Sequence, residues 1–295
     1  MTGRRSREPS AESHSLETHN TVFAPHTPRS TSPITHAAAS VVAGLLASLF
    51  LLFLVAPVAE LVVAGGAAGV RRLGSDAELR GALARTALTA TAATLLGVLG
   101  GTPLAYLLAR RRFPGRAVLA AVLDLPLLVP HPVAGIALLI VFGRESVAGR
   151  TLLEAGLRFA GSLEGIVAAM LFVSAPLYVS AAREAFARVD VRYEAVARTL
   201  GDPAWRVFRR VTLPLSLRGL VAAAVVMWAR AVSEFGSIVI ITYNPHVASV
   251  LIFDRFTSFG LAEVLPAAAA LVLLSLLPLV VLRALRYERS AGVEA

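Results

Sequence analysis

Long runs of apolar residues alternate along the chain with short polar stretches. Six runs hold about 20 residues or more, which is the length that a helix needs to cross a hydrocarbon core of roughly 30 Å. Prolines interrupt the third and the sixth of them. The pattern predicts an all-α integral membrane protein with six transmembrane helices, and the runs cover residues 37–64, 81–109, 117–142, 163–182, 219–242 and 263–282.

The composition agrees with this interpretation. Hydrophobic residues make up 56% of the 295 residues, charged residues make up 16%, and the mean hydropathy is +0.71. A net charge of +9 would suggest nucleic acid in a soluble chain, but here its distribution matters more. All 28 basic residues are arginine, and 19 of them fall in the two ends and in the segments after the second and fourth runs. The positive-inside rule therefore predicts that both ends lie in the cytoplasm. The arginine-only, alanine-rich composition indicates a GC-rich bacterial genome, so we expect a multi-pass protein of the bacterial plasma (inner) membrane with no nucleic-acid partner.

The two ends differ from the middle of the chain. Residues 1–36 are rich in Ser, Thr, Pro and His and lack aliphatic periodicity, so they predict a disordered cytoplasmic tail. Residues 37–283 form the transmembrane domain, and residues 284–295 form a cytoplasmic C-terminal tail. The tail run "HSLETH" at residues 14–19 has no zinc-helix spacing, and the chain has no cysteine. We therefore expect no metal site.

The long cytoplasmic connection at residues 183–217 combines charge with helix signals. Residues 183–200 contain good helix formers. Gly201 follows them at a position suited to the left-handed conformation that closes a helix. Asp202 and Pro203 then resemble an N-cap followed by proline at the first helical position. The sequence predicts two short helices that meet at a glycine hinge.

The second of these helices is predicted over residues 203–212, with Leu213-Pro214 ending it. Trp205, Phe208 and Val211–Thr212 recur with the period of one helix face, and arginines occupy the remainder. An aromatic residue beside cations on a cytoplasmic helix indicates docking to another protein. A helix that lies on anionic lipid is the alternative that these residues leave open.

The third apolar run has an interrupted interior. Pro126, Pro130 and Pro132 break the segment "DLPLLVPHPVAGIALLI" at residues 124–140. Broken helices at membrane depth occur where the freed backbone meets protein or a polar cavity. The segment therefore predicts a lining of a translocation pathway, with His131 as its polar residue, or a kink that only shapes packing.

The fifth run contains two opposite charges. Arg230 and Glu234 are four residues apart, which is the spacing of an ion pair on one helix face. Intramembrane pairs usually face the interior of a helix bundle, either along a pathway or as a structural clamp. We find no H-E-x-x-H, no G-x-S-x-G and no cysteine or lysine, so we expect no catalytic residue. Without lysine the chain also lacks the P-loop lysine that holds ATP phosphates.

The cytoplasmic connection resembles the loop signature of ABC-importer permeases, which reads E-A-A, three residues, Gly, nine residues, Ile, one residue, Leu-Pro. Counting from Gly201, Val211 replaces the isoleucine and Leu213-Pro214 follows, while Glu194 sits one residue early. The resemblance implies that this loop contacts a cytoplasmic ATPase subunit that binds ATP and Mg, so this chain needs no cofactor. The residues that it assigns to the contact are Glu194, Ala195, Ala197, Gly201, Asp202, Pro203, Trp205, Phe208, Arg209, Leu213 and Pro214.

Two further segments resemble the molybdate/tungstate branch of these permeases, which is close to the sulfate/thiosulfate branch. They are the Pro-x-Pro-Val-x-Gly-x-x-Leu-Leu run and the Arg-Ala-x-Ser-Glu-Phe-Gly run, followed by "LIFDRFTSFGL" at residues 251–261. The resemblance implies a type I importer permease fold, a second copy of the chain, an extracytoplasmic binding protein and a surrounding lipid bilayer. Sulfate or thiosulfate as the substrate, and an ion-coupled secondary carrier, are the alternatives. The implied pathway residues are Pro130, His131, Pro132, Gly135, Arg230, Ser233, Glu234 and Gly236.

Overall fold

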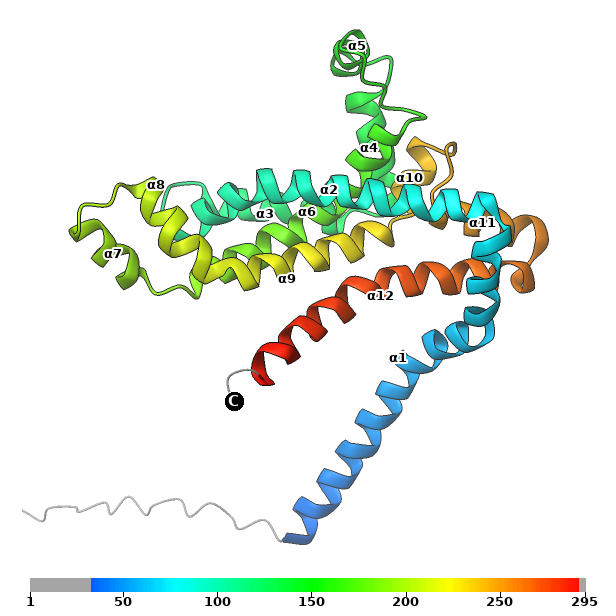
Figure 1. Ribbon diagram of the computed structural model, residues 1–295, viewed down its shortest axis with the longest axis horizontal. Coiled ribbons are helices and arrows are strands. Elements are labelled where there is room, and N and C mark those ends of the chain that lie inside the picture. Colours follow the sequence, from blue (N-terminus) through cyan, green and yellow to red (C-terminus); the bar gives the residue numbers. More distant parts are fainter. Residues whose placement is uncertain (1–32, 292–295) are drawn as a thin grey trace, which may run out of the picture. The chain divides into compact units, whose positions relative to one another are not determined.

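The computed structural model describes the backbone of residues 33–291 and the side chains of residues 40–278. The "HSLETH" run and most of the predicted N-terminal tail lie outside the described residues. Every regular element in the described part is a helix, as predicted (Figure 1). In chain order the helices are α1 (Pro33–Ser75), α2 (Ala77–Arg110), α3 (Arg116–Leu128), α4 (His131–Phe142), α5 (Val147–Glu154), α6 (Leu163–Ala187), α7 (Val191–Thr199), α8 (Ala204–Val207), η1 (Phe208–Thr212), α9 (Leu213–Val232), α10 (Gly236–Ile241), α11 (Ala248–Phe259) and α12 (Leu261–Ala291).

The spans agree with the apolar runs except for the fifth, whose helix begins and ends earlier than the run. Within the described residues, five helical stretches are long and apolar enough to cross a membrane. The pair α3 and α4 passes the same test together, but it is bent by 114° at the break that the prolines predicted. Two compact units meet inside α1, one ending at Leu54 and the other beginning at Val55. In the first unit, the described side chains of α1 are exposed throughout.

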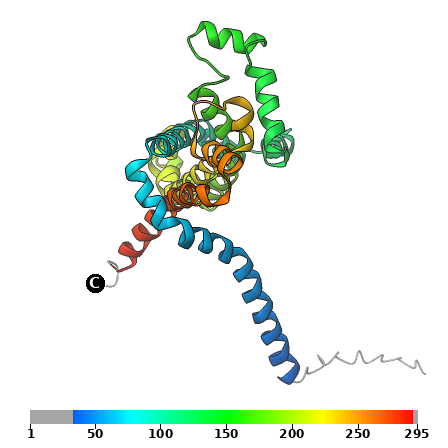
Figure 2. The same cartoon turned by 90° about the vertical axis from the view of Figure 1, so that its right-hand side faces the viewer.

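The core of the second unit is built on α2, α6 and α9, which run side by side (Figures 1 and 2). Small residues let these helices approach closely. A Cβ on Gly219 of α9 would lie 2.5 Å from the Cβ of Ala185 on α6. Close backbone approach at small residues is the usual way in which helices associate inside a bilayer, where apolar burial alone gives little driving force.

The helix that contains Pro214 does not end there, so the predicted stop at Leu213-Pro214 is wrong. α8, η1 and α9 form one uninterrupted helix of 29 residues, from Ala204 to Val232. The five residues of η1 form a π-helical turn directly before Pro214. This wider turn accommodates the proline ring and its missing N–H without a break.

Other boundaries also differ from the prediction. The prediction of one helix over residues 183–200 is wrong. The helix α6 ends at Ala187, and a new helix begins after Asp190, whose side chain accepts a hydrogen bond of 2.9 Å from the N–H of Arg192. The fifth run is divided after Val232, where a turn separates α9 from α10. The prolines of the last run do not interrupt α12, which continues to Ala291 through part of the predicted C-terminal tail.

An ion-pair group ties the start of α2 to α11. Asp76 caps α2 by accepting from the N–H of Leu79 at 2.9 Å, and its second oxygen lies 2.6 Å from Arg255. Arg255 also lies 3.0 Å from Glu78. The hydrogen bond from Arg255 holds the pKa of Asp76 below its ordinary value.

Asp76→Asn is expected to lower the free energy of unfolding by about 1.5 kcal/mol, because it removes the ion pair but keeps an oxygen for the helix cap. Asp76→Ala should cost about 1 kcal/mol more through the lost cap. Since folding lowers the pKa of Asp76, its contribution is complete above the unfolded value of about 4 and is lost as the pH falls through the folded value. Thermal unfolding of the purified variants at pH 7 and pH 3 measures both effects, and a pH-independent difference would contradict the assignment.

Candidate functional site

The connection at residues 183–217 has the predicted glycine hinge. Gly201 has a φ of +92°, in the left-handed region that favours glycine. The N–H of Gly201 donates to the carbonyl of Arg198, and the N–H of Asp202 donates to the carbonyl of Ala197. The predicted cap at Asp202 is wrong by one residue, because Pro203 occupies the N-cap position and the Asp202 carboxylate pairs with Arg206 at 3.0 Å.

Gly201→Val is expected to weaken the hinge by about 1–2 kcal/mol, because a β-branched residue resists a positive φ. Apart from the two neighbouring residues, no atom of the described part of the chain lies within 4 Å of a Cβ added at this glycine, so the cost arises from the backbone and not from a clash. Gly201→Asn should recover most of the loss, since asparagine tolerates the left-handed region. Transport rate and hydrogen exchange of α7 report the effect, and equal behaviour of the two variants would contradict this account.

The same loop exposes an aromatic side chain. Trp205 is 69% exposed and stacks on Phe208 with ring centroids 5.7 Å apart. Phe208 in turn contacts Tyr106 of α2 edge-on at 4.9 Å. Val207, Phe208 and Thr212 form the inward face of the helix, and Trp205 points outward. The sequence had placed Trp205 on the same face as Phe208 and Thr212, and this prediction is wrong. An exposed indole that is supported by a packed ring suits contact with another molecule.

The remaining predicted loop residues divide by exposure. Glu194 is the one predicted loop residue that is buried, and other residues of this chain surround its side chain. Sequence reasoning missed Leu200, which is 82% exposed and directly precedes the hinge glycine. Its apolar side chain at a helix end beside charged residues was the signal that could have identified it. The exposed members are Ala195, Gly201, Pro203, Trp205, Arg209 and Pro214, and the half-buried members are Ala197, Asp202, Phe208 and Leu213.

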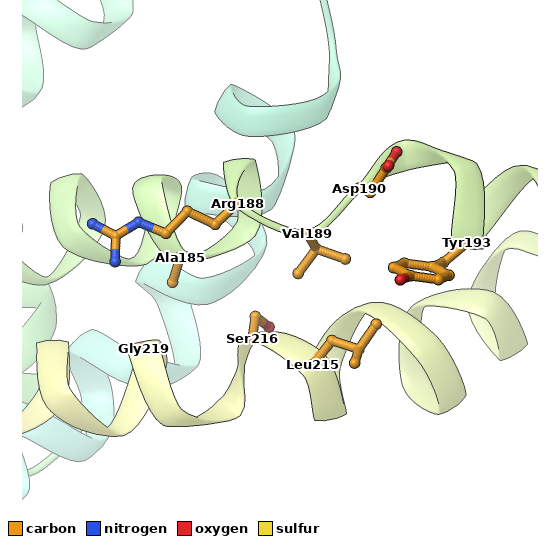
Figure 3. Close-up of a pocket in the computed structure, with 8 residues that line it drawn as sticks. All are labelled: Ala185, Arg188, Val189, Asp190, Tyr193, Leu215, Ser216 and Gly219. Atoms are coloured by element: carbon orange, nitrogen blue, oxygen red, sulfur yellow. The ribbon is translucent and has the colours of Figure 1, made fainter.

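Two cavities flank the loop. One has a volume of about 920 Å³, and its lining includes Tyr106, Arg111 and Trp205. The other has a volume of about 420 Å³ and lies between the α6–α7 junction and the start of α9 (Figure 3). Val189 and Tyr193 line one wall of this second cavity, and the opposite wall comes from α9. The loop therefore borders a surface hollow on each side.

A charged cluster lies at the far end of α9, and it unites the two transmembrane segments that the sequence singled out. Arg230 Nη1 lies 3.0 Å from Glu234 Oε2, which confirms the predicted ion pair. His131, at the start of α4, contacts the Arg230 guanidinium through Nε2 and lies 3.7 Å from Glu234. Glu234 is 1% exposed, and its Oε1 accepts from the N–H and the hydroxyl of Ser237. The carboxylate neutralises Arg230 and also holds the start of α10.

The other predicted pathway residues shape the backbone around this cluster. A Cβ on Gly135 would lie 2.8 Å from the Ser237 carbonyl oxygen, and one on Gly236 would lie 2.7 Å from the His131 Cβ. Both glycines therefore permit close contact between α4 and α10. Pro130 and Pro132 stand at the break before α4 and in its first turn, and Ser233 bonds the Arg230 carbonyl at 2.9 Å.

The fold is that of the membrane-spanning subunits of ABC importers. One chain in the crystal structure of a bacterial ABC transporter involved in the import of the acidic polysaccharide alginate aligns with a TM-score of 0.64 at 17% identity. The alignment covers 86% of this chain and 96% of that chain.

The chain belongs to the family described as binding-protein-dependent transport system inner membrane component, whose model matches residues 101–287. It is thus a translocation component. It is 43% identical to the molybdate/tungstate transport system permease protein WtpB of Thermococcus kodakarensis, over 71% of this chain and 80% of that protein. It is 39% identical to the molybdenum transport system permease protein ModB of Escherichia coli K12, over 63% of this chain and 85% of that protein.

Proposed function

We propose that this chain is the membrane permease subunit of an ATP-driven importer of molybdate and tungstate. The observation that carries the proposal is the single helix from Ala204 to Val232, which bears Trp205 near one end and Arg230 near the other. The helix connects a surface suited to an ATPase with a charged cluster suited to an oxyanion. The molybdate and tungstate permeases among its relatives support the choice of anion.

The proposal includes partners. Since the chain contains no lysine, it has no P-loop lysine, and ATP hydrolysis falls to a separate ATPase subunit that holds ATP and Mg. A second copy of the chain would complete the translocation pathway, and an extracytoplasmic binding protein would deliver the anion. One structural neighbour is an alginate ABC transporter in complex with a pentasaccharide-bound periplasmic protein, which supports a partner of this kind.

The charged cluster suits a dianion that must pass without being trapped. An unpaired arginine in a membrane-spanning segment would hold molybdate strongly, but Glu234 neutralises Arg230 at 3.0 Å. The side chain of His131 is 45% exposed, so it can meet a passing anion. Its backbone position is set by the flanking prolines, so His131→Ala should change the uptake rate more than the yield of assembled transporter.

Uptake by the complete transporter in proteoliposomes tests the function. Radioactive molybdate should enter only when ATP and the binding protein are present, and excess tungstate should compete while excess sulfate should not. Sulfate that outcompetes both metal oxyanions would replace the proposed substrate. Uptake driven by a proton gradient without ATP would instead show an ion-coupled carrier.

Orientation can be tested with single cysteines, because the natural chain has none. Leu200→Cys, on the proposed cytoplasmic loop, should react with a membrane-impermeant thiol reagent only after cells are permeabilised. Val147→Cys should react in intact cells, since Val147 is 83% exposed at the start of α5 on the opposite side. The reverse labelling pattern would place both ends of the chain outside the cytoplasm.

A further inference from the structure

A buried arginine holds the cytoplasmic end of α2 to the loop. Arg110 lies in the last turn of α2, and its side chain is only 9% exposed. Its Nε lies 2.9 Å from Oε1 of Glu194 on α7, and its Nη2 donates to the carbonyl of Val189 at 2.8 Å. One cation of α2 therefore contacts both the α6–α7 junction and α7 itself.

The carboxylate of Glu194 extends this contact to a third element. Its Oε1 accepts a hydrogen bond of 2.9 Å from the hydroxyl of Thr212, which is fully buried in η1. Its Oε2 lies 3.3 Å from Arg198, one turn along α7. We call Arg110, Glu194 and Thr212 the Glu194 tie, because together they connect α2, α7 and η1.

The tie is the main buried contact of α7. Among the nine residues of this helix, all within the described part of the chain, Glu194 alone is buried. The cavities of about 920 and 420 Å³ lie on the two sides of the loop. A segment with so little apolar packing is held mainly by its polar contacts, so the stability of its position depends on them.

The tie also meets the helix that reaches the charged cluster. Thr212 is the last residue of η1, and the same uninterrupted helix continues to Val232. Arg230 lies in its last turn, paired with Glu234. A displacement of the loop that is transmitted to η1 is therefore applied to a continuous helix that ends at the cluster.

We infer that Arg110, Glu194 and Thr212 are positioning residues that make α7 move as one body with α2 and with the α8–η1–α9 helix. Movement of the loop by a partner ATPase then reaches the Arg230–Glu234 pair. The inference rests on the proposed function for the partner that moves the loop.

Hydrogen exchange of residues 191–200 in the assembled transporter tests the tie. Thr212→Val keeps the side-chain shape but removes the donor, and it should speed exchange of α7 roughly tenfold. Thr212→Ser keeps the hydroxyl and should remain near the wild-type rate. Arg188→Gln is the control, because Arg188 lines the cavity of about 420 Å³ beside the loop, is highly exposed, and forms only a surface pair with Glu184 at 3.7 Å that is expected to contribute little.

The number of ATP molecules hydrolysed per anion imported tests the positioning role. Thr212→Val should raise this number several-fold while the ATPase still copurifies, and Thr212→Ser should restore it. Unchanged exchange in Thr212→Val overturns the tie, whatever the transported anion is. If exchange becomes faster but the number of ATP molecules hydrolysed per anion stays unchanged, the tie is a stabilising contact only, and transmission to the cluster is overturned. If Thr212→Val does not assemble, the double variant Arg110→Gln with Glu194→Gln replaces it, with the same two outcomes.

Discussion

Glu234→Gln is expected to destabilise the assembled protein by about 1–3 kcal/mol, because the Arg230 guanidinium, whose side chain is 24% exposed, loses its charged partner. The carboxylate lies 3.0 Å from the guanidinium and is 1% exposed, so the variant places a neutral amide against the cation at a buried position. The yield of folded transporter and its unfolding temperature measure this cost. Protein that does assemble should import molybdate more slowly, since an uncompensated arginine holds the anion.

A double-variant cycle measures the interaction energy between Arg230 and Glu234 apart from the contacts that each makes with other residues. Arg230→Gln with Glu234→Gln removes both charges, and it should assemble better than either single variant. Glu145→Gln is a matched control, because Glu145 is 98% exposed and lies 3.9 Å from Arg150 in a surface pair of little energetic value. Additive effects of the two single changes would show that Arg230 and Glu234 are not energetic partners.

Trp205→Ala is expected to weaken the contact with the ATPase by about 2–4 kcal/mol, if the indole is a buried anchor of that interface. The ring is 69% exposed in this chain and rests on Phe208, so its removal leaves the permease core intact. The amount of ATPase that copurifies with the permease should fall by roughly 30-fold or more at limiting concentration.

Two comparisons make this result specific. Trp205→Phe keeps an aromatic surface on Phe208 and should retain most of the binding. Unfolding of Trp205→Ala without the ATPase should resemble the wild type, because the lost contact lies between subunits. Normal copurification of the ATPase with Trp205→Ala would contradict the docking role and favour a helix that lies on lipid.

The sequence by itself determined the features that arise within short segments of the chain. Apolar runs of membrane-spanning length predicted the helices, because a bilayer requires that backbone groups bond internally. The positive φ of Gly201 was predictable because a glycine followed by Asp-Pro closes one helix before another begins. The Arg230–Glu234 pair was also local, since the two residues are only four apart, although Glu234 lies in the turn after α9 and not on the same helix face as expected.

Other features depended on contacts between distant residues. The proline at position 214 predicted a helix end, but the π-helical turn before it lets the helix continue. His131 joins Arg230 only because α4 and α10 pack closely through two glycines. No local pattern specifies such a meeting of residues 99 positions apart.

Glu194 shows the difference most clearly. The sequence placed it on the loop among the residues that contact an ATPase, one position earlier than the family pattern. One residue turns a helical side chain by about 100°, and only the tertiary structure shows which way it faces. It faces inward, onto Arg110 and Thr212. Its direction was decided by burial against α2 and η1, whereas the membrane spans and the hinge were decided by the local chain.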